Sequence, residues 1–239
     1  MITGILVALP EELHTLTKSK IKQGECFAVS ENTLIVLSGS GPTNANNAAQ
    51  SLIDQGATQL ISWGCAGALA PYLKAGDLVI PKCVLTKDSL KLATHKAWSE
   101  QVIKLIDKSI NYHQACLLER DTVISLAQEK NRLYQLTQAI AVDMESAAVA
   151  QLAKQAQIPF IAIRSIVDPA KLNLPEAINY AMTDSGVVSI AKLTRYLCRH
   201  PGELPGLIIL GLHFKAASKT LQYLARQLPQ ITQTQWSPA

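Results

Sequence analysis

The sequence has no stretch of about 20 uncharged apolar residues, so we do not expect the chain to span a membrane. Its first residues run directly into the apolar segment 2–8, with no charged region and no small-residue cleavage site, which argues against a signal peptide. The net charge of +4 is spread thinly and forms no basic cluster interleaved with aromatic residues. A nucleic-acid partner is therefore not expected, and we expect a cytoplasmic protein.

Spacing patterns typical of metal ligands are also missing. The five histidines show neither H-x-H nor H-E-x-x-H spacing, and the five cysteines form no C-x-x-C pair. An odd number of cysteines without a pattern favours reduced, buried thiols over disulfides or zinc. We therefore expect no metal and no cofactor, and five free thiols, Cys26, Cys65, Cys83, Cys116 and Cys198.

The sequence does contain apolar segments that alternate with helical patterns. With 239 residues, of which 48% are apolar, the chain can bury a large core. A clear helical pattern covers 45–53, with Pro42 suited to its first turn and Gly56 to its C-terminal end. Strand-like runs occupy 2–8, 33–38, 59–63, 77–81 and 159–167. This alternation predicts an α/β fold, a three-layer αβα sandwich with a central mixed, mostly parallel sheet.

The character of the chain changes near Arg199. A helix-breaking stretch at 200–206 precedes an amphipathic pattern over 207–228, which predicts one helix of about six turns. We expect a catalytic domain over 1–198 and a helical extension over 199–239. The extension packs on its own domain or on a second subunit, or it contacts a membrane surface or lipidic substrate. Packing on protein is the preferred interpretation. Contact with a membrane or lipid is supported by the cations beside the apolar seam: His213, Lys215, Lys219 and Arg226.

Two carboxylates occupy positions where apolar periodicity would have them face inward. Glu145 begins a helical stripe that continues with apolar residues, and Asp168 ends the apolar run 159–167. A buried carboxylate costs several kcal/mol unless a partner compensates it. At the first turn of a helix, backbone N–H groups offset part of that cost and leave Glu145 ionised. Asp168 lies at the carboxyl end of a strand, where ligands bind in open α/β sheets.

Two glycine-bearing segments offer backbone donors near strand ends. The loop 38–44 is not a dinucleotide fingerprint, because Asn44 replaces its third glycine. The segment 63–69 predicts a second turn, and Cys65 within it is a small packing residue rather than a nucleophile.

Glu12 follows the first strand. Its carboxylate either faces the crevice at the carboxyl ends of the strands or simply begins a helix. We expect loop and short helix over 169–183, close to Asp168.

Five of these segments together resemble the superfamily of purine nucleoside phosphorylases and methylthioadenosine/S-adenosylhomocysteine nucleosidases. The resemblance covers about residues 1–198. Within the superfamily, Glu129 to Ser146 and the tail 197–205 resemble the hopanoid-associated phosphorylases, which act on adenosylhopane. The segments that carry the resemblance are the first strand with Glu12, the loop 38–41, the run 64–69 with Gly76 and Asp77, the run 142–145, and the run 164–168.

The resemblance implies roles for individual residues in breaking an N-ribosidic bond. Asp168 would protonate N7 of the leaving adenine, and burial would keep that carboxyl protonated. Glu12 would deprotonate the attacking water, and ionised Glu145 would accept hydrogen bonds from the ribose hydroxyls. Met144 would pack on the ribose. Further substrate contacts are expected from Cys65, Ala66 and Gly67, with an adenine wall near Thr122 and Val123.

Two departures from the superfamily pattern bear on the nucleophile. Phosphorylases carry a phosphate-binding arginine where this chain has Ser62. Nucleosidases carry a serine where this chain has Cys65, and the cysteine thiol is a poorer hydrogen-bond partner than a serine hydroxyl. The serine at position 62 weakens phosphorolysis, in which phosphate would be a co-substrate, and the retention of Glu12 favours water as the nucleophile. We therefore expect hydrolysis of a 5′-modified adenosine. The alternatives are a methylthioadenosine/S-adenosylhomocysteine nucleosidase and a nucleoside-binding module without turnover. We expect a homo-oligomer that takes a small nucleoside, either free or lipid-linked.

Overall fold

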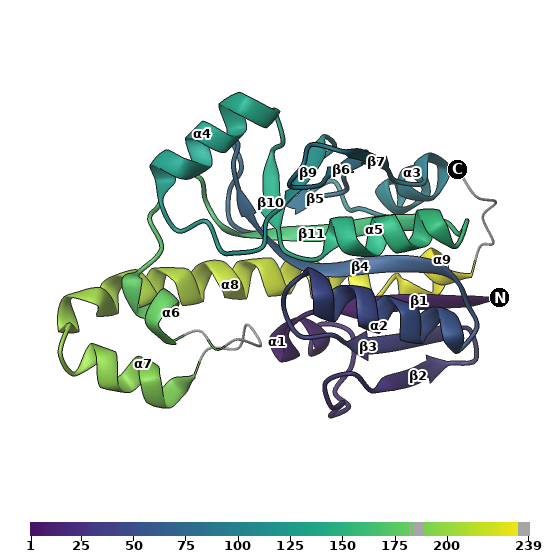
Figure 1. The fold of residues 1–239 in the computed structure, drawn as a ribbon, viewed down its shortest axis with the longest axis horizontal. Helices are drawn as coiled ribbons and strands as arrows, with labels where there is room; N and C mark the ends of the chain where they lie inside the picture. The colour runs from purple at the N-terminus through teal and green to yellow at the C-terminus, as the bar shows by residue number, and fades with distance from the viewer. Residues whose placement is uncertain (182, 184–188, 234–239) are drawn as a thin grey trace.

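Figure 1 shows the computed structural model, which describes residues 1–181, 183 and 189–233. Its strands are β1 (Ile2–Val7), β2 (Cys26–Ser30), β3 (Thr33–Leu37), β4 (Ala57–Ala68), β5 (Leu78–Val79), β6 (Cys83–Leu85), β7 (Lys91–Ala93), β8 (Tyr112–His113), β9 (Cys116–Glu119), β10 (Ala141–Asp143) and β11 (Phe160–Asp168). Its α-helices are α1 (Pro10–Leu13), α2 (Pro42–Asp54), α3 (Lys96–Lys104), α4 (Ala127–Thr137), α5 (Ser146–Gln155), α6 (Glu176–Ala181), α7 (Ile190–Leu197), α8 (Leu204–Ala225) and α9 (Leu228–Thr232).

The strands form one mixed sheet in which parallel pairs predominate. Its order is β2-β3-β1-β4-β10-β9-β6-β7, and β11 pairs with β4 on the other side and continues to β5 and β8. Parallel pairs join β1 to β3 and β4, β11 to β4, β9 to β6 and β10, and β5 to β8. The predicted mixed, mostly parallel sheet is confirmed.

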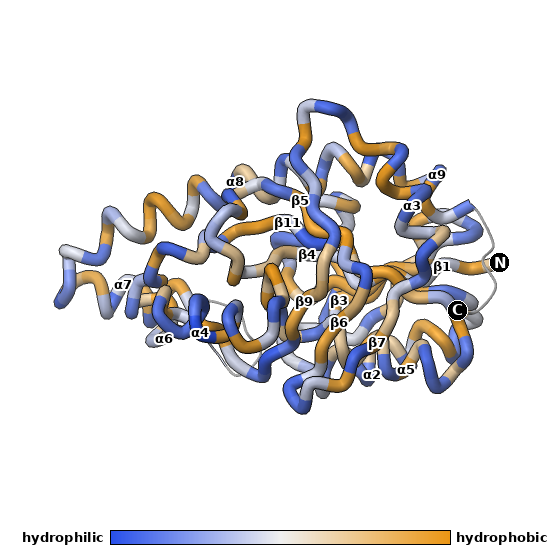
Figure 2. Tube along the Cα trace, turned by 90° about the horizontal axis from the view of Figure 1, so that it is seen from above, coloured by the Kyte–Doolittle hydropathy of each residue, from blue (hydrophilic) through white to orange (hydrophobic). Residues whose placement is uncertain are grey.

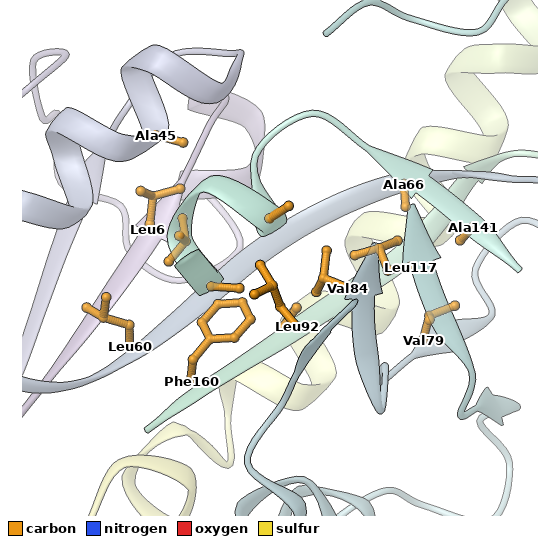
Figure 3. Packing of buried hydrophobic residues seen from close by; sticks show 14 of the residues in the cluster. Leu6, Ala45, Leu60, Ala66, Val79, Val84, Leu92, Leu117, Ala141 and Phe160 are labelled. Atoms are coloured by element: carbon orange, nitrogen blue, oxygen red, sulfur yellow. The ribbon is translucent and has the colours of Figure 1, made fainter. Parts of the chain in front are cut away.

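Helices cover both faces of this sheet. Strand residues alternate between the faces, so Leu6 lies in a core cluster with the small residues of α2 and α5, which Figure 3 shows from close by. Its neighbours Ile5 and Val7 lie in the opposite cluster, where α3, α8 and α9 contribute Trp98, Leu221, Leu224 and Ile231. The two clusters make the predicted three-layer sandwich.

The predicted helix after Pro42 is α2, and Gly56 beyond its end has a φ of 91°, a left-handed conformation that favours glycine. The expected turn over 63–69 is wrong. Residues 57–68 form one long strand, β4, because β1 pairs with its first half while β10 pairs with its end. The stretch after Asp168 contains α6, as expected; residues 182 and 184–188 lie outside the described part.

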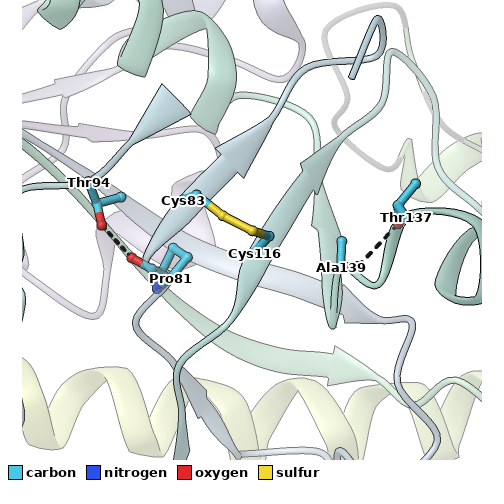
Figure 4. Close-up of a disulfide and its surroundings, with 6 residues drawn as sticks. All are labelled: Pro81, Cys83, Thr94, Cys116, Thr137 and Ala139. Atoms are coloured by element: carbon cyan, nitrogen blue, oxygen red, sulfur yellow. Dashed lines mark hydrogen bonds between the residues drawn. A yellow bond between two sulfur atoms is a disulfide. The ribbon is translucent and has the colours of Figure 1, made fainter. Parts of the chain in front are cut away.

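The expectation of five free thiols is also wrong. Cys83 and Cys116 form a disulfide between β6 and β9 (Figure 4). The parallel register pairs these two residues directly, with their Cα atoms 4.7 Å apart, which is within the range that a disulfide spans. No sequence pattern pointed to this pair, because 33 positions separate the two cysteines. Cys26, Cys65 and Cys198 are free thiols.

The predicted long helix is α8, and its two halves differ. Ala217, Leu221 and Leu224 are buried against the sheet, so contact of that half with a membrane is contradicted by the packing. The first half projects beyond the sheet together with α6 and α7 (Figures 1 and 2), and its apolar residues are exposed: Leu204, Ile208, Ile209 and Leu212. Among the described residues, no helix is long and apolar enough to cross a membrane. Residues 234–239 of the expected extension lie outside the described part.

Candidate active site

The site lies where β4 changes its partner on one side. β1 pairs with β4 as far as Ser62, and β10 begins to pair with it at Gly67. On the opposite side, β11 runs along β4 and aligns Arg164 with Gly64 and Asp168 with Gly67. The segments that follow β1 and β10 therefore converge on the middle of β4, next to Gly64.

Glu12, on the short helix α1, reaches the part of β4 between its pairing with β1 and its pairing with β10. One carboxylate oxygen accepts hydrogen bonds from the backbone N–H groups of Ala8 and Leu9, each at 3.1 Å, and the other accepts from Cys65 N–H at 2.7 Å. The bond to Cys65 N–H takes the place of a bond to a neighbouring strand, because β1 pairs with β4 only as far as Ser62 and β10 only from Gly67. Burial raises the pKa of Glu12, while the Arg164 charge and the three N–H groups lower it. Glu12 is thus a rigidly held carboxylate with an increased proton affinity.

Arg164 is a buried cation, 2% exposed, on the inner strand β11. Its Nε donates to Asp143 at 2.7 Å, and one terminal nitrogen donates to Ser62 at 2.6 Å and to Ser146 at 3.0 Å. Burial lowers the pKa of its guanidinium, but the carboxyl groups of Asp143, Glu12 and Glu145 together outweigh burial and raise it. Arg164 is therefore the positive centre of an acidic cluster.

Gly64 lets Glu12 and Arg164 approach the same point. A Cβ atom at this position would lie 2.5 Å from Glu12 Oε1 and 2.8 Å from Arg164 Nη1, both shorter than van der Waals contact. Any side chain here would displace one of these groups. The glycine is required by this close approach.

Glu145 joins the cluster from the residue that precedes α5. Its carboxylate accepts from Gly41 N–H at 2.9 Å, in the glycine-rich loop, and from Met144 N–H at 3.3 Å. Burial and the Asp143 charge raise the pKa of Glu145 to about 8. This direction opposes the expectation that Glu145 is ionised. Its side chain bonds the loop rather than the first turn of its own helix.

Asp168 ends β11 beside Gly67, whose Cβ position lies 3.6 Å from Asp168 Oδ2. The same oxygen lies 2.5 Å from Nζ of Lys130, a side chain of α4 with no exposed surface. Burial raises the pKa of Asp168 more than Lys130 lowers it, and burial lowers the pKa of Lys130. Burial therefore disfavours the charged form of both groups.

The other expected substrate residues lie on the same strands or in the segment before α4. Met144 is half-buried beside Glu145. Cys65, Ala66 and Gly67 lie on β4. Burial raises the pKa of the Cys65 thiol, which keeps the thiol neutral. Thr122 is exposed and Val123 half-buried, in a segment whose Ser125 carbonyl accepts from Leu174 N–H. Glu12, Glu145 and β4 are therefore brought together, and 122–123 lies near the loop that follows Asp168.

Arg164 and Lys130 belong to the site but were not singled out from the sequence. A charged residue inside the apolar run 159–167 was a usable signal for Arg164. For Lys130, the signal was its spacing of three residues before the buried Leu133 in a helix. The described residues contain no group of three or more His, Cys, Asp or Glu side chains placed to hold a metal ion.

Comparisons with known proteins agree with this architecture. The model of the Phosphorylase superfamily matches residues 3–197. A 5′-methylthioadenosine/S-adenosylhomocysteine nucleosidase of Buchnera aphidicola is 28% identical, covering 75% of this chain and 92% of the relative. A protein of the same description from Baumannia cicadellinicola is 30% identical, covering 71% and 87%.

Solved structures share the fold at low sequence identity. The nucleosidase of Helicobacter pylori, solved with butyl-thio-DADMe-Immucillin-A, is 19% identical with a TM-score of 0.71, covering 97% of both chains. The futalosine hydrolase of Helicobacter pylori is 18% identical with a TM-score of 0.68, also covering 97% of both chains. These likenesses confirm the nucleoside phosphorylase-like α/β sandwich.

Proposed function

Because the chain belongs to the Phosphorylase superfamily and is an enzyme of the N-ribosyl hydrolase or phosphorylase class, we propose that it hydrolyses a 5′-modified adenosine and releases adenine. The observation that supports this most is the placement of Glu12 and Asp168 at two levels of β4. Glu12 bonds Cys65, while Asp168 lies beside Gly67. The relatives named as nucleosidases favour the same reaction.

Glu12 and Asp168 lie at different points along β4. Glu12 accepts a hydrogen bond from Cys65 N–H, whereas Asp168 lies beside Gly67, nearer the end of the strand. Inverting glycosidases likewise separate their acid from the carboxylate that activates water, which leaves room for that water. In the proposed reaction the acid would act at N7 of the adenine and Glu12 would act at the water.

In the proposed step, the bond from C1′ to the base nitrogen breaks and its electron pair goes to the adenine. The proton of Asp168 passes to N7, and the carboxylate remains beside Lys130. Water forms the new C1′–O bond and loses a proton to Glu12, whose raised pKa favours accepting it. Exchange with solvent then returns a proton to Asp168 and removes the proton from Glu12. Glu145 and Met144 would hold the ribose.

Water is the better nucleophile for this site on electrostatic grounds. The carboxyl groups of Glu12, Asp143 and Glu145 act on the guanidinium of Arg164. Its Nε already donates to Asp143, and one terminal nitrogen donates to Ser62 and Ser146. A phosphate dianion would approach an acidic cluster in which Arg164 is already paired with Asp143. Ser62, at the position of the phosphorylase arginine, accepts from Arg164 and is fully buried.

The 5′ substituent divides the proposal into two candidates. The relatives are named for methylthioadenosine and S-adenosylhomocysteine, which favours those substrates. The exposed apolar half of α8 favours a lipid-linked nucleoside such as adenosylhopane, with peripheral contact to a membrane. Its exposed residues include Ile208 (56%) and Leu212 (60%), and the cations Lys192 and Arg195 lie on the neighbouring helix α7.

The test is to incubate the purified protein with methylthioadenosine, S-adenosylhomocysteine and adenosylhopane, with and without phosphate, and to measure free adenine. We expect release without phosphate, and the preferred substrate identifies the 5′ group. Release from none of the three would refute the enzyme proposal and leave a nucleoside-binding module. Release that requires phosphate would refute hydrolysis.

The membrane contact has its own experiment. Flotation of the full-length protein with anionic vesicles is compared for the wild type and for Ile208→Ser with Leu212→Ser, at exposed positions. We expect the wild type to float and the double variant to remain in the soluble fraction. Equal behaviour would remove the membrane contact without affecting the reaction.

A further inference from the structure

Lys130 makes contacts around Asp168 beyond the single ion pair. Lys130 Nζ lies 2.5 Å from Asp168 Oδ2, 2.8 Å from the carbonyl oxygen of Leu172 and 3.4 Å from that of Pro169. These three acceptors match the three N–H donors of an ammonium group. The side chain thus ties the carboxylate to the loop that follows it.

The pair is shielded from water and joins distant parts of the chain. Lys130 has no exposed surface, and Asp168 is 6% exposed. Lys130 comes from α4, a surface helix, whereas Asp168 ends an inner strand. A buried ammonium is costly without a partner, so a lysine on this face of the helix calls for a specific explanation.

We propose that Lys130 is a positioning residue for Asp168, which orients the carboxyl group toward the base and sets how readily it gives up its proton. This inference rests on the proposed function and adds the residue that adjusts its acid. In an apolar site without a cation, a carboxyl group holds its proton tightly. The ammonium stabilises the carboxylate that remains after the proton has passed to adenine, so Asp168 becomes a stronger acid.

The charges that face this pair are few in the described residues. Asp168 is faced by Lys130 from α4 and, at longer range, by His213 from α8, both of which favour the carboxylate. The charge that acts on Lys130 is that of Asp168. Loss of the Lys130 charge should therefore raise the pH at which Asp168 loses its proton. An opposite charge at this range shifts a carboxyl group by about one to three pH units.

The experiment measures kcat for adenine release against pH in the wild type, Lys130→Met and Lys130→Arg, with the exposed Lys171→Met as a control. In Lys130→Met, the decline of kcat at high pH should move upward by about one to three pH units. Lys130→Arg retains the charge and should keep the wild-type midpoint, as should Lys171→Met. If Lys130→Met does not fold, Lys130→Gln replaces it, since it keeps a donor for Leu172 without the charge.

A ¹³C NMR titration of the Asp168 carboxyl carbon, assigned with Asp168→Asn, gives a readout without turnover. Its midpoint should rise in the uncharged variants and stay unchanged in Lys130→Arg. An unchanged or lower midpoint in the uncharged variants would overturn the role of Lys130, even if the wild type releases adenine. Absence of adenine release from the wild type would instead refute the proposed function, so the two failures are distinguishable.

Discussion

Replacing Gly64 by alanine tests whether the reaction depends on the position of Glu12 beside Arg164. The new Cβ atom would lie 2.5 Å from Glu12 Oε1, whereas ordinary contacts begin at about 3.4 Å. Relief requires a displacement of about 1 Å by Glu12, by Arg164 or by β4. A misplacement of that size in a catalytic site costs roughly 10²-fold in rate, equivalent to about 2.7 kcal/mol in the activation free energy.

The assay is kcat for adenine release from the substrate that the wild type prefers. Gly211→Ala is the matched control, because its Cβ would meet nothing within 4 Å, and its kcat should stay within about threefold of the wild type. Circular dichroism and thermal unfolding establish that Gly64→Ala is folded, since overpacking alone costs about 1–3 kcal/mol of stability. A folded Gly64→Ala protein with wild-type kcat would refute the placement of the reaction beside Gly64.

Three further predictions concern other groups. Asp168→Asn should lower kcat by about 10²- to 10⁴-fold with nucleoside binding retained in calorimetry, and full turnover would exclude Asp168 as the acid. The pKa of Glu145 is raised from 4.5 to about 8, so the native state binds more protons than the unfolded state and loses stability as pH rises through that range. In urea unfolding, Glu145→Gln should show a smaller loss of stability between pH 5 and pH 9, and equal losses would contradict the raised pKa. Replacing Cys83 and Cys116 by alanine should cost about 3–4 kcal/mol, given a separation of 33 residues, and an unchanged urea midpoint would argue against the disulfide.

Local patterns predicted the fold because periodicity alone identifies buried strands and amphipathic helices. The runs at 2–8 and 159–167 became β1 and β11, and the pattern after Pro42 became α2. Short strands such as β10 were missed, since three residues carry too little periodicity. The true length of β4 depends on its change of partner, which is a property of the assembled sheet.

The sequence predicted which carboxylates belong to the site, because a charged residue beside an apolar segment indicates burial. Glu12, Glu145 and Asp168 stood out as carboxylates beside apolar segments, and the structure places all three at β4 or its neighbours. Their proton affinities depend on pairs that are distant in sequence. Asp143 raises the pKa of Glu145, and Lys130 lies against Asp168 from a helix 38 positions earlier.

The most direct test of the account is the fate of the oxygen that attacks C1′. The enzyme is incubated with its preferred substrate in H₂¹⁸O containing phosphate, and the sugar product is analysed by mass spectrometry. Hydrolysis at the Glu12 site predicts a free sugar that carries one ¹⁸O at C1′. A ribose-1-phosphate derivative would contradict water as the nucleophile.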